Sequence, residues 1–313
     1  MANPQVGVDH EVGYIVESTI GTTPATPAVQ WLPYTGTTLK ETRELIQSER
    51  LGNAFNVGSR HGNNQVGGDV TGEIVYGAFD DLFEAAVGGT WATDTPVAGT
   101  DQLKAGTGRQ GFTFVRKAGT IGYDYFAGCE INTTAIEVGQ NGNATLTFGV
   151  IGTSKAAGHT EIAGSTYTAA SSRLPIAGFD VTLRREGSDV AIATAISLNI
   201  NRNLERSFVI GSRDTGAKPK GKLQVDGSLT LQYIDYTYAD LFKNETRTDL
   251  EIVFKDTLDA SGSELSFQLP NVLPTSADDD VSGDGEIPIN VSFQAEYDDT
   301  EATNLIIERT AAP

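Results

Sequence analysis

The sequence contains few of the side chains that carry metal and nucleophile chemistry. Among 313 residues there is one cysteine, Cys129, and there are three histidines, His10, His61 and His159. The single cysteine excludes a disulfide framework within the chain and is typical of assembly in a reducing cytoplasm. No histidine has a second histidine or a cysteine at metal-ligand spacing. We therefore expect no metal, no cofactor and no catalytic residues, and we interpret Cys129 as a small residue on a strand.

Long apolar runs and basic residues are also scarce. No run approaches the ~18 apolar residues of a membrane helix, and the residues after Met1, ANPQVGVDHE, lack the basic start and apolar stretch of a signal peptide. We therefore expect no membrane contact. Lys and Arg number 22 against 41 Asp and Glu, and the net charge is −19. Such a chain does not hold nucleic acid by neutralising phosphates, and it repels polyanions over about a Debye length.

One acidic segment has some features of a cation site. Residues 278–286 read DDDVSGDGE, and Asp278, Asp280 and Gly283 stand where a calcium loop would have them. The twelfth position of that loop needs a bidentate Glu, and here it is Ile289. The pattern favours a solvated acidic turn at Asp278–Glu286, and the sequence leaves cation binding there open.

Glycine and the residues that favour strands are abundant. The chain has 35 glycines together with many Thr, Val and Ile residues, which is typical of a β-rich protein with many turns. Several short stretches alternate apolar and polar residues, and this period of two predicts half-buried strands in an antiparallel sandwich or barrel. These stretches are Phe112–Arg116, Ala144–Ile151, Phe179–Arg185, Ile196–Asn201, Leu250–Lys255, Leu265–Leu269, Ile289–Phe293 and Leu305–Glu308.

Part of the sequence occurs twice. FNVGSRHGNNQVGGDVTGEI (55–74) and FVIGSRDTGAKPKGKLQVDGSL (208–229) both run from a Phe through Gly-Ser-Arg and a polar stretch to a Gly among alternating residues. The tripeptide DLF follows each copy, at 81–83 and at 240–242. Three matches in one order predict a duplicated module. We place the boundary in the Ala-, Gly- and Ser-rich segment 155–178, which gives modules 1–165 and 166–313.

Each copy also predicts a short helix after its strand. In AFDDLFEAAVGG, Phe79, Leu82 and Phe83 stand at helical spacing, and Gly88 offers a stop. In TYADLFKN, Thr237 is the predicted N-cap. Each module is therefore expected to carry a strand, a short flanking helix and further strands.

The two polar stretches are predicted to be long loops. Connections of this length are usually functional or disordered, and their presence in both copies favours a function. We predict that they contact a neighbouring molecule, with apolar anchors near their bases and arginines as ion-pair donors. The basic cluster GAKPKGK (216–222) favours a subunit contact over DNA in so acidic a chain. The predicted contact residues are Phe55, Val57, Gly58, Ser59, Arg60, His61, Phe208, Ile210, Gly211, Ser212, Arg213, Lys218, Lys220 and Lys222.

Two segments resemble a known family. VGYIVESTIGTTPATPAVQWLPYTGTTLKETRE (12–44) and the stretch from GGDVTGEI to DDLFEAAVGGTW (67–91) are similar to the tail tube proteins of bacteriophages with long, non-contractile tails. The likeness covers most of residues 10–155 and, more weakly, 178–310. The chain resembles a duplicated-module form of that family.

The resemblance implies a fold and an assembly. Tail tube modules are β-sandwiches with a flanking helix, and their sheets join around a ring into a β-barrel that lines a lumen. A duplicated chain is expected to form trimeric, pseudo-hexameric rings that stack through the long loops. The tube, a structural part of the virion assembled in the bacterial cytoplasm, holds a tape-measure protein and later conducts DNA. An acidic lumen repels phosphate, so that DNA slides without specific binding.

Two other functions stay open on the sequence. A two-domain β-sandwich binding or adhesion module of a phage or bacterial surface would be a monomer with a ligand, but the two tryptophans, Trp31 and Trp91, lie far apart in the sequence. A hydrolase on a β scaffold is disfavoured by the shortage of histidine and of nucleophile motifs, although paired carboxylates would be compatible with one.

Overall fold

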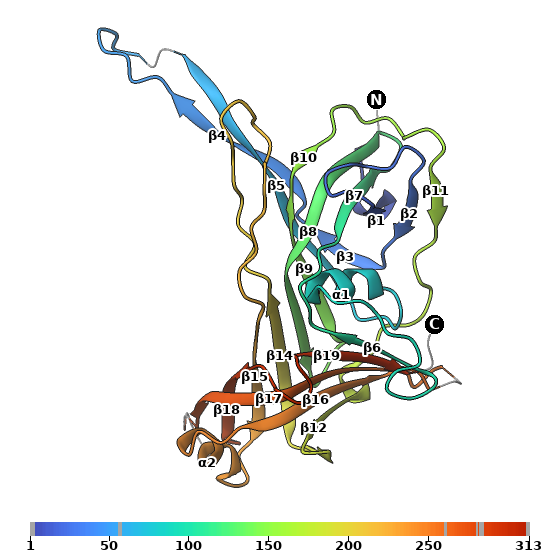
Figure 1. Ribbon diagram of the computed structural model, residues 1–313, viewed down its shortest axis with the longest axis vertical. Helices are drawn as coiled ribbons and strands as arrows, with labels where there is room; N and C mark the ends of the chain where they lie inside the picture. The colour runs from blue at the N-terminus through green and yellow to red at the C-terminus, as the bar shows by residue number, and fades with distance from the viewer. Residues whose placement is uncertain (1–3, 56–57, 260–261, 280, 282–284, 311–313) are drawn as a thin grey trace.

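The computed structural model describes residues 4–55, 58–259, 262–279, 281 and 285–310. The described chain is mainly β (Figure 1), with the two expected short helices, α1 (Asp80–Val87) and α2 (Thr237–Lys243). The strands up to the middle of the chain are β1 (His10–Glu17), β2 (Ala28–Trp31), β3 (Tyr34–Thr37), β4 (Lys40–Gln47), β5 (Ser59–Glu73), β6 (Thr100–Lys104), β7 (Gly111–Ala118), β8 (Gly122–Gly139), β9 (Thr145–Gly152) and β10 (Ser154–Lys155). The later strands are β11 (Thr166–Thr168), β12 (Val181–Arg185), β13 (Ser188–Asp189), β14 (Ala193–Asn201), β15 (Gln224–Gln232), β16 (Thr248–Lys255), β17 (Glu264–Asp278), β18 (Pro288–Ala295) and β19 (Ile306–Thr310). Single 3-10 turns stand at Gly7–Asp9 and Gly178–Asp180.

The predicted mainly β fold is confirmed. Each stretch chosen for its period of two overlaps a strand, namely β7, β9, β12, β14, β16, β17, β18 or β19. Cys129 is fully buried on β8, as expected for a structural cysteine. Helix α1 ends as predicted, because Gly88 adopts the left-handed conformation at φ 68° and its N–H bonds the Glu84 carbonyl.

Two local predictions are wrong. The stretch after Gly58 is not a loop, because Ser59 to Gly67 continue β5 and pair with β4. From Ser59 to Gly67 only Gly62 and Val66 are buried, so the side chains show no apolar period of two, yet the backbone groups still pair across the ladder. Thr237 is not the N-cap of α2 but its first residue, and the Asp235 side chain accepts the Thr237 N–H instead.

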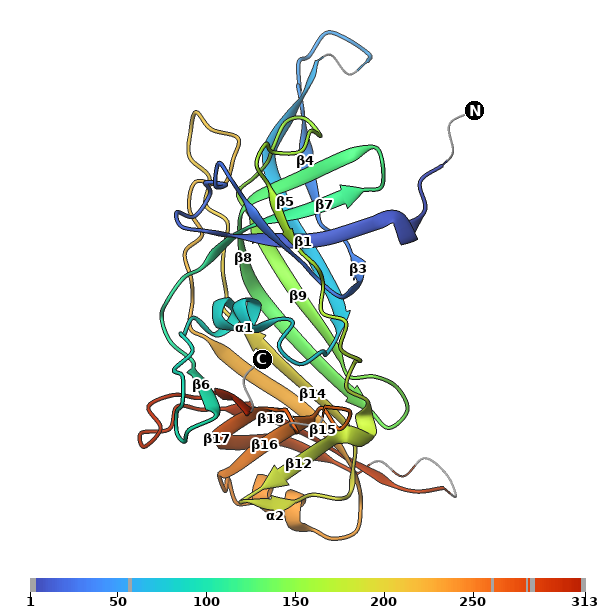
Figure 2. The ribbon, with the colours of Figure 1, turned by 90° about the vertical axis from the view of Figure 1, so that its right-hand side faces the viewer.

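One large antiparallel sheet runs through the described chain. It begins at β3 and β4, which both pair with β5, and continues through β9, β8, β14, β15 and β18 to β17. Figures 1 and 2 show its twist: β8 and β9 run along the long axis, whereas β17 and β18 run across it. The sheet is open, and the pairing of β8 with β14 joins its two halves.

The pairing pattern of the sheet occurs twice. In the first half β5 pairs with β9, β9 with β8, and β8 also with β7. In the second half β15 pairs with β18, β18 with β17, and β17 also with β16. β11, just beyond the predicted boundary, pairs with β2, and β19 pairs with β6. The limits 1–165 and 166–313 stay a prediction, since these two pairs cross them.

The core lies on one face of the sheet and continues across both halves. Helix α1 buries Leu82, Phe83 and Val87 against this face. Phe83 meets Phe148 of β9 edge-on at 5.7 Å and Phe267 of β17 at 5.5 Å. Edge-to-face pairs of this kind add about 0.5–1.5 kcal/mol each to the burial of the rings. The helix therefore stabilises the sheet and the joint between its two halves.

Candidate functional site

The side of the large sheet that faces away from the core is mostly polar, and Ala135 and Leu273 are apolar exceptions in the same row as Asn199 and Asp226. On β5 the alternation buries Val70 and leaves Thr71 and Glu73 on the other face, and every neighbouring strand repeats it. The small polar and acidic residues of this second face are Asp69, Thr71, Glu73, Thr133, Glu137, Thr145, Thr147, Ser197, Asn199, Asp226, Ser228, Thr230, Asn290, Ser292 and Gln294. We call this set the polar face.

Six adjacent strands of the polar face carry negative charge and no cation. No Lys or Arg occurs in β8, β9, β14, β15, β17 or β18, whereas Glu137 and Asp226 lie on the face and Asp278 ends β17. Its hydroxyl and amide groups bond to one another, as when Thr230 donates to Asn290 Oδ1 at 3.0 Å. The absence of cations leaves nothing on these strands to bind phosphate.

Both ends of the large sheet are open edges. Among the described residues, β3 and β4 pair only with β5, on one side. At the other end, residues 273–278 of β17 pair only with β18, because β16 and β19 meet β17 before that point. An open edge presents unpaired N–H and C=O groups, which is a template for pairing with another strand.

The β4–β5 hairpin extends well beyond the body of the molecule (Figure 1) and carries apolar residues near its tip. Leu51 is fully exposed, and Phe55 is 81% exposed. Leu45 and Ile46 of β4 are also exposed. Large apolar side chains grouped on one projection mark a contact with another protein.

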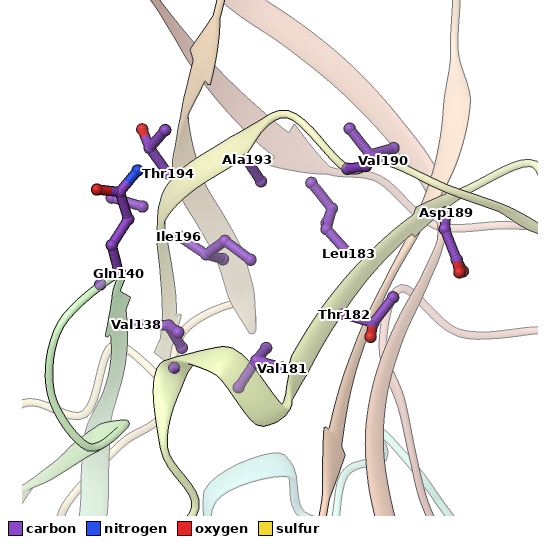
Figure 3. Close-up of a pocket in the computed structure, with 14 residues that line it drawn as sticks. Val138, Gln140, Val181, Thr182, Leu183, Asp189, Val190, Ala193, Thr194 and Ile196 are labelled. Atoms are coloured by element: carbon purple, nitrogen blue, oxygen red, sulfur yellow. The ribbon is translucent and has the colours of Figure 1, made fainter.

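A hollow of about 310 Å³ lies at the opposite end of the molecule, between β12, β13 and β14. Figure 3 shows Val181, Leu183 and Ile196 lining it, with Asp189 at its margin. It contains no histidine, cysteine or pair of facing carboxylates that would support catalysis. Among the described residues, no group of three His, Cys, Asp or Glu side chains is placed to hold a metal ion.

The segment 202–223, which corresponds to the first hairpin in sequence, lies back along the first half of the chain. Its only paired positions are two isolated bridges, Leu204 with Lys220 and Ser207 with Ala217. Figure 1 shows it beside β5, and Asn64 of β5 donates its backbone N–H to the Arg213 carbonyl at 2.8 Å. The tip of this segment exposes Val209 and Ile210.

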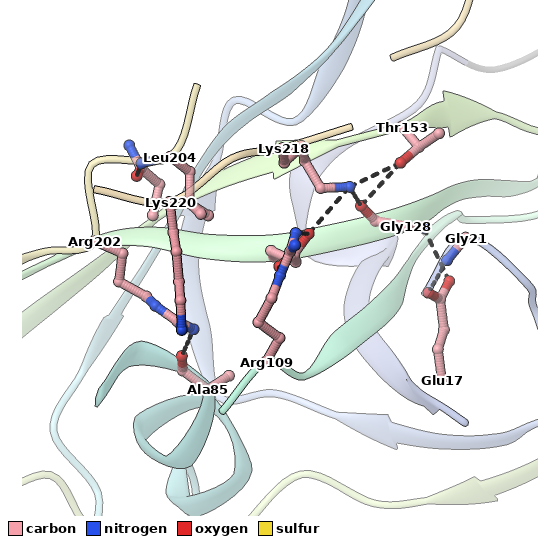
Figure 4. Close-up of polar contacts among 12 residues, drawn as sticks. Glu17, Gly21, Ala85, Arg109, Gly128, Thr153, Arg202, Leu204, Lys218 and Lys220 are labelled. Atoms are coloured by element: carbon pink, nitrogen blue, oxygen red, sulfur yellow. Dashed lines mark hydrogen bonds and ion pairs between the residues drawn. The ribbon is translucent and has the colours of Figure 1, made fainter. Parts of the chain in front are cut away.

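Basic side chains fix that segment to the body (Figure 4). Lys218 is buried, and its Nζ donates to the Gly128 carbonyl at 2.6 Å and to Thr153 Oγ1 at 2.8 Å. The same Nζ lies 3.2 Å from Glu130 Oε1, and Arg109 holds that carboxylate through two bonds of 2.7 and 2.8 Å. These contacts satisfy a buried charge with two cations and explain the ordered path of the segment.

Comparison with known proteins identifies the family. A sequence model of the phage tail tube protein family matches residues 7–295. The chain belongs to the phage tail tube protein family. No curated protein matches the chain. Members of this family are structural proteins of the phage tail, and the mainly β fold agrees with that assignment.

In this tail tube protein, the residues predicted to make contacts fall into two groups. Phe55 and Gly58 precede β5, and Ser59, Arg60 and His61 begin it, all exposed on the hairpin; Val57 lies outside the described residues. Ile210, Gly211, Ser212 and Arg213 are exposed at the second tip, with Phe208 half-buried beside them. Their role in contacts between rings stays a prediction.

The three lysines of the second tail tube segment differ from one another. Lys218 is buried inside the chain, Lys220 donates to the Thr107 carbonyl, and Lys222 is exposed. Lys218 and Lys220 are thus engaged within the subunit. The acidic segment Asp278–Glu286 lies partly outside the described residues, so cation binding there stays open.

Sequence reasoning did not identify the polar face or the two edges of this tail tube protein. The signal for the face was present, because β8, β9, β14, β15, β17 and β18 all lack Lys and Arg. The edges depend on which strands pair, and pairing over long sequence separations has no local signature. No helix in the described part of the chain is long and apolar enough to span a membrane.

Proposed function

We propose that this tail tube protein assembles into rings of three chains, with the polar face lining a central lumen, and that the rings stack into the tail tube. The observation that carries the proposal is the combination of a mostly polar sheet face, free of Lys and Arg over six adjacent strands, with an open edge at each end. An open edge at both ends of a sheet is resolved when copies close into a ring. The repeated pairing pattern gives each chain two equivalent units, so that three chains supply six.

The composition of the polar face supports a conduit for DNA. Ser, Thr and Asn offer weak, neutral contacts, and Glu137 and Asp226 repel phosphate. With no Lys or Arg on these strands, DNA passing through the lumen meets no site that would hold its backbone. The same lumen is expected to hold a tape-measure protein before ejection. The chain acts structurally rather than as a catalyst, and rings assemble in the bacterial cytoplasm with the other tail proteins.

Stacking is assigned to the β4–β5 hairpin. Leu51 and Phe55 stand on a projection longer than the subunit body requires, and they gain burial only against another molecule. Burying one such side chain contributes about 1.5–3 kcal/mol. A contact from the tip of one ring to the body of the next repeats without closing, which gives a filament.

Negative-stain electron microscopy of the purified protein tests this assignment. We expect rings or tubes with a central channel, and three chains per ring by mass measurement of isolated rings. Six chains per ring would contradict the duplicated-unit argument. A monomer at every concentration and ionic strength would overturn the proposal and favour the binding-module alternative.

A further inference from the structure

The joint between the two halves of the sheet offers a template for the joint between chains. β8 and β14 pair antiparallel in a register that includes Ala135 with Asn199 and Ile136 with Leu198. β8 is the strand that follows β9 in the first half, and β17 is the strand that follows β18 in the second half. β17 therefore corresponds to β8, and its open side corresponds to the side on which β8 pairs with β14.

Each strand at an open edge corresponds to one strand of the internal joint: β17 corresponds to β8, and β3 corresponds to β14. β14 pairs with β15 as β3 pairs with β5, with Leu198 opposite Gly227 and Tyr34 opposite Gly72. Gly72 and Gly227 are the glycines that the sequence repeat already matched. β3 is thus the equivalent of β14, although only β14 has a partner on its second side among the described residues.

We infer that β17 of one chain pairs antiparallel with β3 of the next, in the register of the internal β8–β14 joint. The inference rests on the proposed ring. It names a second copy of this chain as the partner and assigns both edges to one interface.

The register follows from rows of paired residues that cross the sheet. One row contains Tyr34, Gly72, Leu146, Ile136, Leu198, Gly227, Phe293 and Pro274. The first four strands of the row, β3 to β8, correspond to the last four, β14 to β17. Tyr34 therefore corresponds to Leu198, and Ile136 corresponds to Pro274. Continuing the row places Tyr34 of the next chain opposite Pro274.

The adjacent rows give one more pair and the limit of the joint. Gly36 and Thr71 share a row with Ala135, Asn199 and Asp226, and that row ends at Leu273. Thr37 and Val70 share a row that ends at Val272. Val272 already pairs with Thr248 of β16 on its other side, so the joint between chains begins at Leu273. The expected pair in the row of Gly36 is therefore Gly36 with Leu273.

Strand direction agrees with this joint. All strands of the large sheet alternate antiparallel from β3 to β17, so a following β3 would again be antiparallel to β17. Both β4 and β14 lead into the projecting segments, and Figure 1 shows these pointing toward the same end of the molecule. Copies joined in this way keep all projections on one side of the ring, as stacking requires.

The residues at both edges have room for a partner. Thr35 of β3 and Thr275 of β17 are exposed, and a Cβ added at Gly36 would meet nothing within 4 Å. Pro274 has no N–H, so the ladder omits any bond that its nitrogen would have donated. Proline is tolerated on an edge strand for this reason.

Disulfide trapping tests the register. The double variant Gly36→Cys/Leu273→Cys is assembled, oxidised and run on a non-reducing gel. Directly opposed residues have Cβ atoms about 4.5–5.5 Å apart, close to the range that a disulfide spans. Burial raises the pKa of the Cys129 thiol to about 12, so the native cysteine stays protonated and inert.

Three matched variants serve as controls. Ala135→Cys/Asn199→Cys joins two residues of the same row that pair within one chain. It should form an intrachain disulfide, whose yield is the reference for the disulfide between chains. Gly36→Cys/Ser276→Cys is out of register, because Ser276 lies two rows away, opposite Ser292. Co-assembly of the single variants Gly36→Cys and Leu273→Cys should give covalent dimers only.

The expected result is a ladder that ends at a covalent trimer for Gly36→Cys/Leu273→Cys, with at least about tenfold less crosslinking for the out-of-register pair. Tubes that form without this crosslink, or with the out-of-register crosslink instead, overturn the inference and leave the proposed ring standing. Failure of the unmodified protein to form rings or tubes rejects the proposed function, and this inference with it.

Hydrogen exchange on the unmodified protein covers the case in which a cysteine variant does not assemble. Amides of residues 34–36 and 273–278 should exchange at least about tenfold more slowly in tubes than in free subunits. The β8–β14 amides should be protected equally in both forms. Unchanged exchange at either edge overturns the inference.

Discussion

The β4–β5 hairpin and the segment 202–223 share a Phe and a Gly-Ser-Arg but form different structures. The first is a continuous ladder that leaves the body and exposes Leu51 and Phe55. The second has two isolated bridges and is fixed to the body through Lys218 and Arg206. The comparison teaches that two stretches with a shared Gly-Ser-Arg can form a projecting arm in one place and an internal brace in the other.

The stems differ because of a few residues. In 202–223, Pro219 cannot donate a ladder bond, and the lysines on either side of it reach carbonyl groups of the first half. In the first hairpin, the residues from Ser59 to Gln65 are small or polar and pair with β4 across one register shift, between Arg43 and Leu45. Because these contacts hold the segment 202–223 against the body, the β4–β5 hairpin is the arm that can contact another ring.

The largest expected effect separates the two tips. Leu51→Ser/Phe55→Ser should abolish tube formation while leaving rings folded, because about 3–6 kcal/mol of apolar burial per chain would be lost at the contact. Since both side chains are exposed in the subunit, its free energy of unfolding should change by less than about 0.5 kcal/mol. Microscopy and urea unfolding measure the two quantities.

The matched control for the tips is Val209→Ser/Ile210→Ser, which alters the exposed apolar pair of the second tip. It should shorten tubes less than the first variant does. Equal loss of tubes in both variants would show that the two tips act alike and would remove the distinction drawn between them.

The next effect tests the brace. Lys218→Met should lower the free energy of unfolding by about 3 kcal/mol, because Glu130 would keep only Arg109 as a partner for its buried carboxylate. Lys222→Met, at an exposed position of the same segment, should change stability by less than about 0.5 kcal/mol. Urea unfolding followed by circular dichroism compares them. Equal stability of the two variants would mean that the segment is not held through Lys218.

A smaller effect is expected where the brace lies on the arm. Arg206 donates to the Val66 carbonyl at 2.6 Å, and a Cβ at Gly67 would meet Arg206 Nη2 at 2.6 Å and the Val150 carbonyl oxygen at 2.5 Å. Gly67→Ala should therefore lower the free energy of unfolding by about 1–3 kcal/mol. Gly36→Ala, with open space around it, serves as the control and should be nearly neutral. A neutral Gly67→Ala would show that the two segments do not pack closely here.

The smallest effect concerns a hydrogen bond between two side chains, one from each segment. Asn64 Nδ2 donates to Asp214 Oδ1. A double-mutant cycle with Asn64→Ala and Asp214→Ala should give a coupling energy of about 0.5–1 kcal/mol, since one hydrogen bond near the surface contributes that much. A coupling energy of zero would mean that the backbone bond from Asn64 to Arg213 is sufficient.

Much of the fold could be predicted from the sequence. Strands such as β9 and β18 show a clean period of two because one face of each is buried, and α1 shows helical spacing with a Gly stop. The start of β5 could not be found in this way, because Ser59, Arg60 and His61 are all exposed. Local periodicity reports burial, and an exposed ladder has none to report.

The candidate site depended on contacts that no local pattern contains. Lys218 looked like a surface cation in GAKPKGK, and only the approach of β8 reveals its buried partner Glu130. The open edges of β3 and β17 follow from pairing across the whole chain. The absence of Lys and Arg from six strands was visible in the sequence, but its meaning required knowing that those strands share one face.

A cryo-EM reconstruction of the assembled filament tests the central claim most directly. The account predicts rings of three chains, with Glu137, Asn199 and Asp226 lining the channel and the β4–β5 hairpins reaching the next ring. A filament whose channel is lined by any other surface of the chain, with the polar face turned outward, would contradict it.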